Sequence, residues 1–79
     1  MRELVERILK QIVDNPDQVK VREVEGGRVT VLEVSTAKED VGKVIGKNGK
    51  IANALRTIVG AAAAQKGKRA IVEILEDRV

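Results

Sequence analysis

The residues best placed to do chemistry are Gly46-Lys47-Asn48-Gly49, two glycines that enclose two polar residues and are followed by Lys50. We call residues 46–49 the glycine loop. Glycine has no Cβ, so a sugar–phosphate backbone can approach the main chain closely. The loop also begins a predicted helix, whose free N–H groups and dipole attract an anion. Lys47 and Lys50 add positive charge, and Asn48 can bond to phosphate or adopt a left-handed turn. The pattern predicts a site that grips phosphates.

Aliphatic residues flank the glycine loop on both sides and could form an apolar groove for nucleobases. We expect Ile45, Ile51 and Leu55 to point into the protein core. Val44 and Ala52 are then left to line the groove. Bound nucleotides are expected to lie between the short helix that precedes the loop and the edge of a hairpin.

Positive charge is concentrated in the same part of the chain. The formal net charge is +3, from 15 Lys and Arg against 12 Asp and Glu. Residues 41–72 contain seven cations and no acid, whereas the remainder has eight cations and twelve acids. This asymmetry is typical of a surface that meets a polyanion, although a solvated lysine-rich helix would also show it. The candidate nucleic-acid contacts are Lys43, Val44, Ile45, Gly46, Lys47, Asn48, Gly49, Lys50, Ile51, Ala52 and Arg56.

The composition argues against several other kinds of site. The chain has no histidine and no cysteine, so it lacks the usual general base, the commonest metal ligand and any disulfide. It has no aromatic residue on which a base could stack. The acidic pairs Glu39-Asp40 and Glu76-Asp77 are adjacent in sequence, and such neighbours on a helix do not face one site. We therefore expect no catalysis, no metal and no cofactor.

Other phosphate motifs and membrane segments are also missing from the sequence. There is no Gly-x-x-x-x-Gly-Lys-Ser/Thr, and no Gly-x-Gly-x-x-Gly follows a predicted strand. No apolar stretch approaches the ~20 residues that a membrane-spanning helix needs. We expect a cytoplasmic protein.

The helices that position the loop are predicted from periodicity and capping residues. Apolar residues at helical spacing predict a helix over residues 2–13 and another over residues 50–65. A short helix over residues 36–45 precedes the loop, with Thr36 or Asp40 as its N-cap.

The strands are predicted from two alternating runs and one apolar run. Residues 19–25 and 28–35 flank Gly26-Gly27, which suits a two-residue hairpin turn. An apolar run over residues 69–75 predicts a buried strand. The order α-β-β-α-α-β indicates one α+β domain over residues 1–79, with a three-stranded sheet and helices packed on one face. The hairpin register is expected to pair Val21 with Leu32, Val19 with Val34, and Lys20 with Glu33.

Residues 44–50, Val-Ile-Gly-Lys-Asn-Gly-Lys, resemble the signature of KH domains, and the element order resembles their type II (prokaryotic) form. In the type I form the additional strand and helix follow the motif. Residues 40–57, together with the N-terminal helix and the Gly-Gly hairpin, resemble small bacterial single-KH proteins of the KhpA type. Many KH domains have an aliphatic residue three positions after the second glycine, where this chain has Ala52, with Ile51 one position earlier. A base-pocket role is therefore not transferred to Ile51.

The resemblance implies sequence-tolerant binding of single-stranded RNA over about four nucleotides. It also implies a role as an RNA chaperone or post-transcriptional regulator, a homodimer, and a larger KH-containing partner of the KhpB (Jag) type. Single-stranded DNA stays open as a ligand, because no residue is dedicated to the 2′-hydroxyl. The alternative function is a protein-interaction adaptor or dimerisation module in which the glycine loop is only a structural corner.

Overall fold

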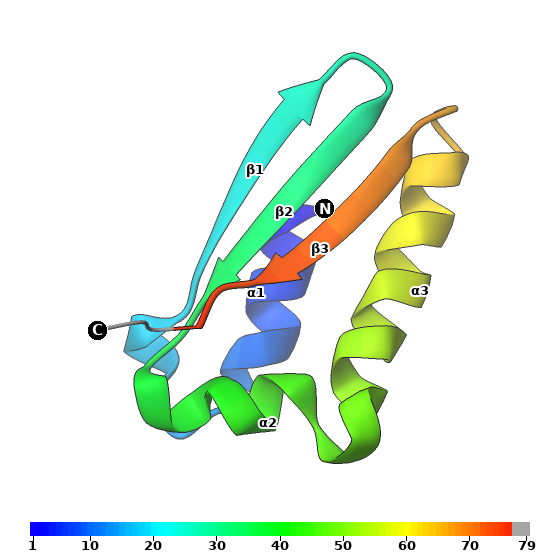
Figure 1. Cartoon of the computed structure of the whole chain (residues 1–79). Helices are drawn as coiled ribbons and strands as arrows, with labels where there is room; N and C mark the ends of the chain where they lie inside the picture. Colours follow the sequence, from blue (N-terminus) through cyan, green and yellow to red (C-terminus); the bar gives the residue numbers. More distant parts are fainter. Residues whose placement is uncertain (77–79) are drawn as a thin grey trace.

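The computed structural model describes residues 1–76 and confirms the predicted order of elements. Short 3₁₀ turns connect the elements at Pro16–Gln18, Lys38–Asp40 and Lys47–Gly49. The helices pack on one face of a three-stranded sheet, as predicted (Figure 1). The elements are α1 (Arg2–Lys10), β1 (Lys20–Gly26), β2 (Val29–Ser35), α2 (Val41–Ile45), α3 (Lys50–Ala64) and β3 (Arg69–Ile74).

The sheet has the strand order β1-β2-β3, with β2 in the centre. β1 and β2 are antiparallel and joined by a hairpin, whereas β2 and β3 are parallel. A parallel pair needs a crossover connection, and here the chain crosses through α2, the glycine loop and α3. β3 is therefore an edge strand that lies beside α3, with which it shares many contacts (Figure 1).

The core lies between the inner face of the sheet and the two longer helices. Each helix contributes a narrow stripe of buried residues at helical spacing, because only one side of it meets the sheet. The hairpin residues that were predicted to face inward are all buried: Val19, Val21, Leu32 and Val34. The helices and β3 add Val5, Leu9, Val44, Leu55, Val59 and Val72.

The predicted hairpin register is wrong by two residues. The turn consists of Gly27 and Arg28, whereas the sequence predicts Gly26 and Gly27. A register shift of two residues preserves the alternation of side chains between the faces, so the inner residues stay buried. Alternation alone therefore cannot distinguish the two registers. The observed pairs include Val21 with Val34, and Arg22 with Glu33 at 3.7 Å between the charged groups.

The end of α1 and the start of α2 also differ from the prediction. α1 ends at Lys10, three residues early. The main-chain N–H groups of Asp14 and Asn15 donate instead to the Asp40 carboxylate, at 3.3 and 2.9 Å. Asp40 occupies the N-cap position of α2, as one of the two predicted alternatives, but its side chain does not bond to the helix, and Thr36 is not an N-cap. The carboxylate of Asp40 thus ties the end of α1 to the start of α2.

Candidate nucleic-acid interface

The glycine loop forms the sharp turn between α2 and α3, and its backbone needs its glycines. Gly46 has φ 79° and Gly49 has φ 74°, both in the region that side chains rarely adopt. A Cβ on Gly46 would lie 2.8 Å from Cγ1 of Ile51 and 2.9 Å from its main-chain nitrogen. Asn48 has φ 57°, a left-handed conformation that asparagine tolerates. The loop is therefore a fixed turn, held against the first residues of α3.

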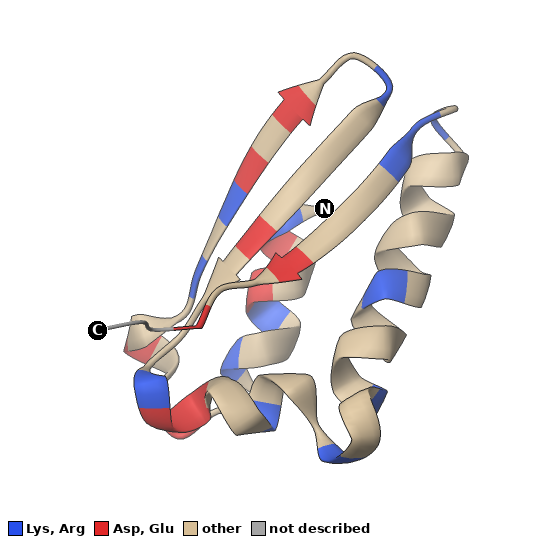
Figure 2. Cartoon of the chain, viewed as in Figure 1, with Lys and Arg blue, Asp and Glu red and all other residues tan. Residues whose placement is uncertain are grey.

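The polar side chains of the glycine loop and of Lys50 face solvent, where a ligand can reach them. Lys47, Asn48 and Lys50 are exposed. Among residues 1–76, no ion pair or hydrogen bond engages the ammonium group of Lys47 or Lys50. Lys47 lies in the 3₁₀ turn between α2 and α3, and Lys50 is the first residue of α3. Figure 2 shows basic positions and no acidic one at this bend. The N-terminus of the 15-residue α3 opens at the same place, so the helix dipole adds to this positive potential.

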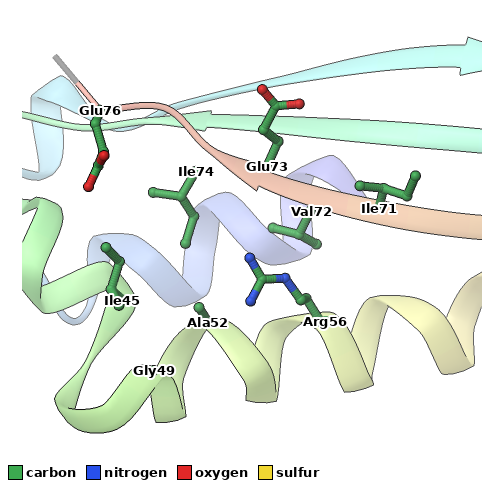
Figure 3. Close-up of a pocket in the computed structure, with 9 residues that line it drawn as sticks. All are labelled: Ile45, Gly49, Ala52, Arg56, Ile71, Val72, Glu73, Ile74 and Glu76. Carbon is green, nitrogen blue, oxygen red and sulfur yellow. The ribbon is translucent and has the colours of Figure 1, made fainter. Parts of the chain in front are cut away.

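A groove of about 360 Å³ adjoins the loop and runs between α3 and β3 (Figure 3). Most of its lining side chains are aliphatic, and three are charged: the guanidinium of Arg56 extends from α3 toward β3, and the carboxylates of Glu73 and Glu76 belong to the opposite wall. Arg56 Nη1 also donates to Asn53 Oδ1 at 3.3 Å. An apolar trough beside a cationic loop suits a ligand that has flat apolar groups and phosphates. The groove is lined by Ile45, Gly49, Ala52, Arg56, Ile71, Val72, Glu73, Ile74 and Glu76.

The aliphatic residues before the loop have exchanged their predicted places. Val44, predicted to line the groove, is fully buried in the core. Ile45, predicted to be buried, lines the groove instead. Ala52 lines the groove as predicted, whereas Ile51 packs against the core and Leu55 is buried within it, also as predicted. Since α2 has only five residues, sequence periodicity could not decide which side of it faces inward.

The far wall of the groove is β3, whereas the sequence predicts the hairpin edge. Five residues of this wall were missed, all of them distant in sequence from the loop. No local signal marks them, because only the parallel pairing of β3 with β2 brings them beside α3. They are Ile71, Val72, Glu73, Ile74 and Glu76.

Lys43 is held away from this groove by acidic residues. Its ammonium group forms an ion pair with Asp14 and lies 3.9 Å from Asp40 Oδ1. The hydrogen bond to Asp14 raises the pKa of Lys43 above its ordinary value, with partial desolvation opposing and both carboxylates adding to the effect. The structure thus separates Lys43 from the other cations of the candidate set and gives it partners of its own.

Asp40, which the sequence marks as a candidate N-cap but not as a buried residue, is a completely buried carboxylate. Besides two main-chain N–H groups, it accepts a hydrogen bond from Asn15 Nδ2 at 3.0 Å. Burial raises the pKa of Asp40, but the hydrogen bonds from Asn15 and Asp14 and the charge of Lys43 outweigh it and hold that pKa below its ordinary value. The Asp40 cluster (Asp14, Asn15, Asp40 and Lys43) ties the turn after α1 to the start of α2.

Residues 1–76 contain neither a metal-binding cluster nor a membrane-spanning helix. No group of three or more His, Cys, Asp or Glu side chains there could hold a metal ion. None of the helices in that range is long and apolar enough to cross a membrane.

Comparison with known proteins places the chain in one family. The family model described as KhpA/KhpB, KH domain, matches residues 2–74. The RNA-binding protein KhpA of Caldanaerobacter subterraneus subsp. tengcongensis is 55% identical over 75 residues, which cover 95% of this chain and 100% of that protein. The RNA-binding protein KhpA of Clostridium acetobutylicum is 52% identical with the same coverage. That of Aquifex aeolicus is 47% identical over 96% of each chain. No solved structure gives a significant match. With this match over nearly its whole length and an α+β fold of the KH-like kind, the chain belongs to the KhpA/KhpB family of KH-domain proteins.

Proposed function

We propose that the protein binds single-stranded RNA without catalysis, with phosphates over the glycine loop and bases in the adjoining groove. One observation carries the proposal: Lys47 and Lys50 lie unpaired, within residues 1–76, beside an apolar groove that opens along an edge strand. The KH mode of binding engages about four nucleotides. We include Gly46, Asn48 and Gly49 in the phosphate contact, and Ile45, Ala52 and Arg56 in the groove. We assign no RNA contact to the remaining three candidates. Val44 and Ile51 pack in or against the core, and Lys43 pairs with Asp14 and Asp40.

The edge strand offers polar groups that can read base edges. Arg69 and Leu75 donate their N–H groups to β2, at 2.8 Å each. Because main-chain groups alternate in direction along a strand, those of Val72 and Ile74 point to the free edge. Both residues line the groove. A base lying on the aliphatic wall could therefore form hydrogen bonds with main chain, which needs no particular side chain and supports sequence-tolerant binding.

The preference for RNA and the cellular role rest on the relatives. The relatives from Caldanaerobacter, Clostridium and Aquifex are bacterial and bear the name RNA-binding protein KhpA. We propose RNA rather than DNA as the ligand, and a cytoplasmic role as an RNA chaperone or post-transcriptional regulator.

Self-association would strengthen a site this small. Two copies in a homodimer raise the effective concentration of the second site once the first is occupied. The family model that matches the chain joins KhpA with KhpB. We propose a homodimer and a larger KhpB (Jag)-type partner as the assemblies in which the site works, to be tested by light scattering and by co-purification of the two proteins.

The primary test is fluorescence anisotropy of an end-labelled single-stranded RNA with the wild type and the Lys47→Asp/Asn48→Asp variant. We expect the variant to lose about tenfold or more in affinity, because it loses phosphate contacts and gains repulsion. If two to four phosphates are neutralised, log K falls against log salt with a slope of about −1.4 to −2.8. Labelled single-stranded DNA of the same sequence tests the preference for RNA.

A matched control separates a local effect from a change in net charge. Arg2→Asp/Gln11→Asp makes the same change in charge at exposed positions of α1 and the turn after it. We expect it to bind RNA almost as the wild type does. If both variants bind like the wild type while keeping its circular dichroism and melting temperature, the loop is only a corner and the adaptor function takes its place.

A further inference from the structure

Two carboxylates belong to the wall of a groove that the proposed function fills with a polyanion. Glu73 lies in β3, and Glu76 follows the end of that strand. Neither side chain forms an ion pair or a hydrogen bond within residues 1–76. A carboxylate repels phosphates, so an acid in this place is unfavourable to binding unless it contacts another part of the nucleotide.

The two side chains point to opposite sides of the wall. Successive side chains of an extended chain alternate in direction, and Glu73 and Glu76 are three residues apart. Figure 3 shows the Glu76 carboxylate directed toward Ile45 on the α3 side of the wall, whereas the Glu73 carboxylate is directed away from α3. Only Glu76 can therefore reach a ligand that lies in the groove.

Glu76 occupies the end of the groove nearest the glycine loop. Ile45 and Gly49 line the same end, and Arg56 lies farther along α3 (Figure 3). A nucleotide whose phosphate lies over the loop would place its base at this end, on the side chains of Ile45 and Ile74. The edge of that base would then face the Glu76 carboxylate.

The main chain beside Glu76 is open to the same base. Leu75 donates its N–H to the carbonyl of Val34 in β2, at 2.8 Å. The main-chain groups of its neighbours Ile74 and Glu76 therefore point to the free edge, because direction alternates along the strand. Main chain offers both a donor and an acceptor, and so it tolerates every base. An ionised carboxylate can only accept, and so it can discriminate between bases.

An acceptor at this position distinguishes cytosine from uracil. Cytosine has an N4 amino group that can donate, whereas uracil has the acceptor O4 at the same place on its ring. Opposite a carboxylate, the amino group gains a charge-assisted hydrogen bond, and the carbonyl leaves two acceptors facing each other. Adenine and guanine also have an amino group to donate. The repulsion between Glu76 and phosphates is the same for every sequence, so it does not affect this discrimination.

We propose that Glu76 is a specificity-determining residue, whose carboxylate accepts a hydrogen bond from the amino group of the base nearest the glycine loop. The groove then favours strands that present cytosine, adenine or guanine at that place and disfavours strands that present uracil. This bias is added to main-chain contacts that tolerate every sequence. The inference rests on the proposed function, since the loop defines which base lies nearest to it.

The test compares two RNAs that differ only at the ring position facing Glu76. Labelled oligocytidine and oligouridine of about 12 nucleotides are titrated with wild type and Glu76→Gln at neutral pH. We expect the wild type to bind oligocytidine about fivefold more tightly than oligouridine. In Glu76→Gln the ratio of the two affinities should fall to about twofold or less, because an amide can donate to uracil as well as accept from cytosine.

Glu73→Gln is the matched control. It removes the same charge from the same wall, at a side chain that points away from α3. Both variants should bind both RNAs somewhat more tightly than the wild type, because each loses a repulsion with phosphates. Only Glu76→Gln should change the ratio of the affinities. Circular dichroism of both variants checks that the fold is retained.

The Glu76 proposal is overturned if the wild type binds the two RNAs equally or prefers oligouridine, if Glu76→Gln keeps the wild-type ratio, or if Glu73→Gln lowers the ratio as much. Failure of the proposed function gives a different result. Either the wild type binds neither RNA, which overturns both, or the Lys47→Asp/Asn48→Asp variant binds oligocytidine as tightly as the wild type does.

Discussion

The two ends of α2 contain similar residues that have opposite roles. At its start, Asp40 is buried and Lys43 is paired with Asp14 and Asp40, so the charges there satisfy one another. At its end, Lys47 and Lys50 face solvent with no acidic partner among residues 1–76. The partners that make this difference come from the turn after α1, more than 20 residues away in sequence. A lysine beside a binding motif is therefore available to a ligand only if no distant segment has already engaged it.

The buried end depends on complete hydrogen bonding. A buried carboxylate is costly unless donors and a counter-charge surround it. Asp40 has three hydrogen bonds and a nearby ammonium group, so it joins the turn after α1 to the start of α2. The start of α2 should therefore govern stability, and its end should govern binding.

Replacement of Asp40 should have the largest effect on stability. Asp40→Ala leaves two main-chain N–H groups and the Asn15 amide without their acceptor and Lys43 with one carboxylate fewer. We expect the melting temperature to fall by roughly 10 °C, measured by circular dichroism. RNA affinity, measured well below that temperature, should change by no more than about twofold, since the loop lies about two helical turns away.

Asp17→Ala is the control for this comparison, because Asp17 is exposed in the same connection and its carboxylate forms no ion pair or hydrogen bond within residues 1–76. It should melt within a few degrees of the wild type. The division of roles along α2 breaks down if folded Asp40→Ala loses RNA binding to the extent that the Lys47→Asp/Asn48→Asp variant does.

Two glycines, one at each end of α2, allow a further comparison, in which the expected changes in the free energy of unfolding are smaller. Gly42, in the first turn of α2, has open space where a Cβ would be, whereas a Cβ on Gly46 would collide with Ile51 at φ 79°. We expect Gly42→Ala to raise the free energy of unfolding by about 0.5–1 kcal/mol, and Gly46→Ala to lower it by about 1–3 kcal/mol. Urea denaturation of both variants measures the two values. Equal effects of the same sign would show that the loop turn is not strained against α3.

These contrasts explain how far the sequence could predict the molecule. Periodicity and turn residues were enough for the order of elements and for the inner face of the hairpin. They left the register open, because a shift by two residues returns every side chain to the same face. They could not set the rotation of α2 either, and so Val44 and Ile45 were exchanged.

The candidate site was predicted in part for a related reason. The glycine loop is contiguous in sequence, so its residues predict their own turn. The opposite wall of the groove is formed by β3, which the crossover brings beside α3 only in the folded protein. The role of Asp40 depends in the same way on Asp14 and Asn15, which no local pattern connects to it. Contacts between segments that are distant in sequence depend on the topology of the whole fold, so no local pattern predicts them.

Protonation of Asp40 in acid should weaken the start of α2, and this effect on stability should be the smallest of those predicted. The pKa of Asp40 is held below its ordinary value of 3.8 when the protein is folded. The carboxylate therefore contributes stability above that ordinary pKa, and the contribution is lost as the pH falls through the lower pKa of the folded state.

Other carboxylates also weaken the fold in acid, so the comparison must be made with Asp40→Asn, which cannot ionise. Between about pH 5 and pH 3 we expect urea midpoints to fall more steeply for the wild type than for Asp40→Asn. The effect is smaller than that of Asp40→Ala because a protonated carboxyl can still accept hydrogen bonds. Parallel curves for the two proteins would mean that Asp40 has the same pKa folded and unfolded, and that its hydrogen bonds do not favour the charged form.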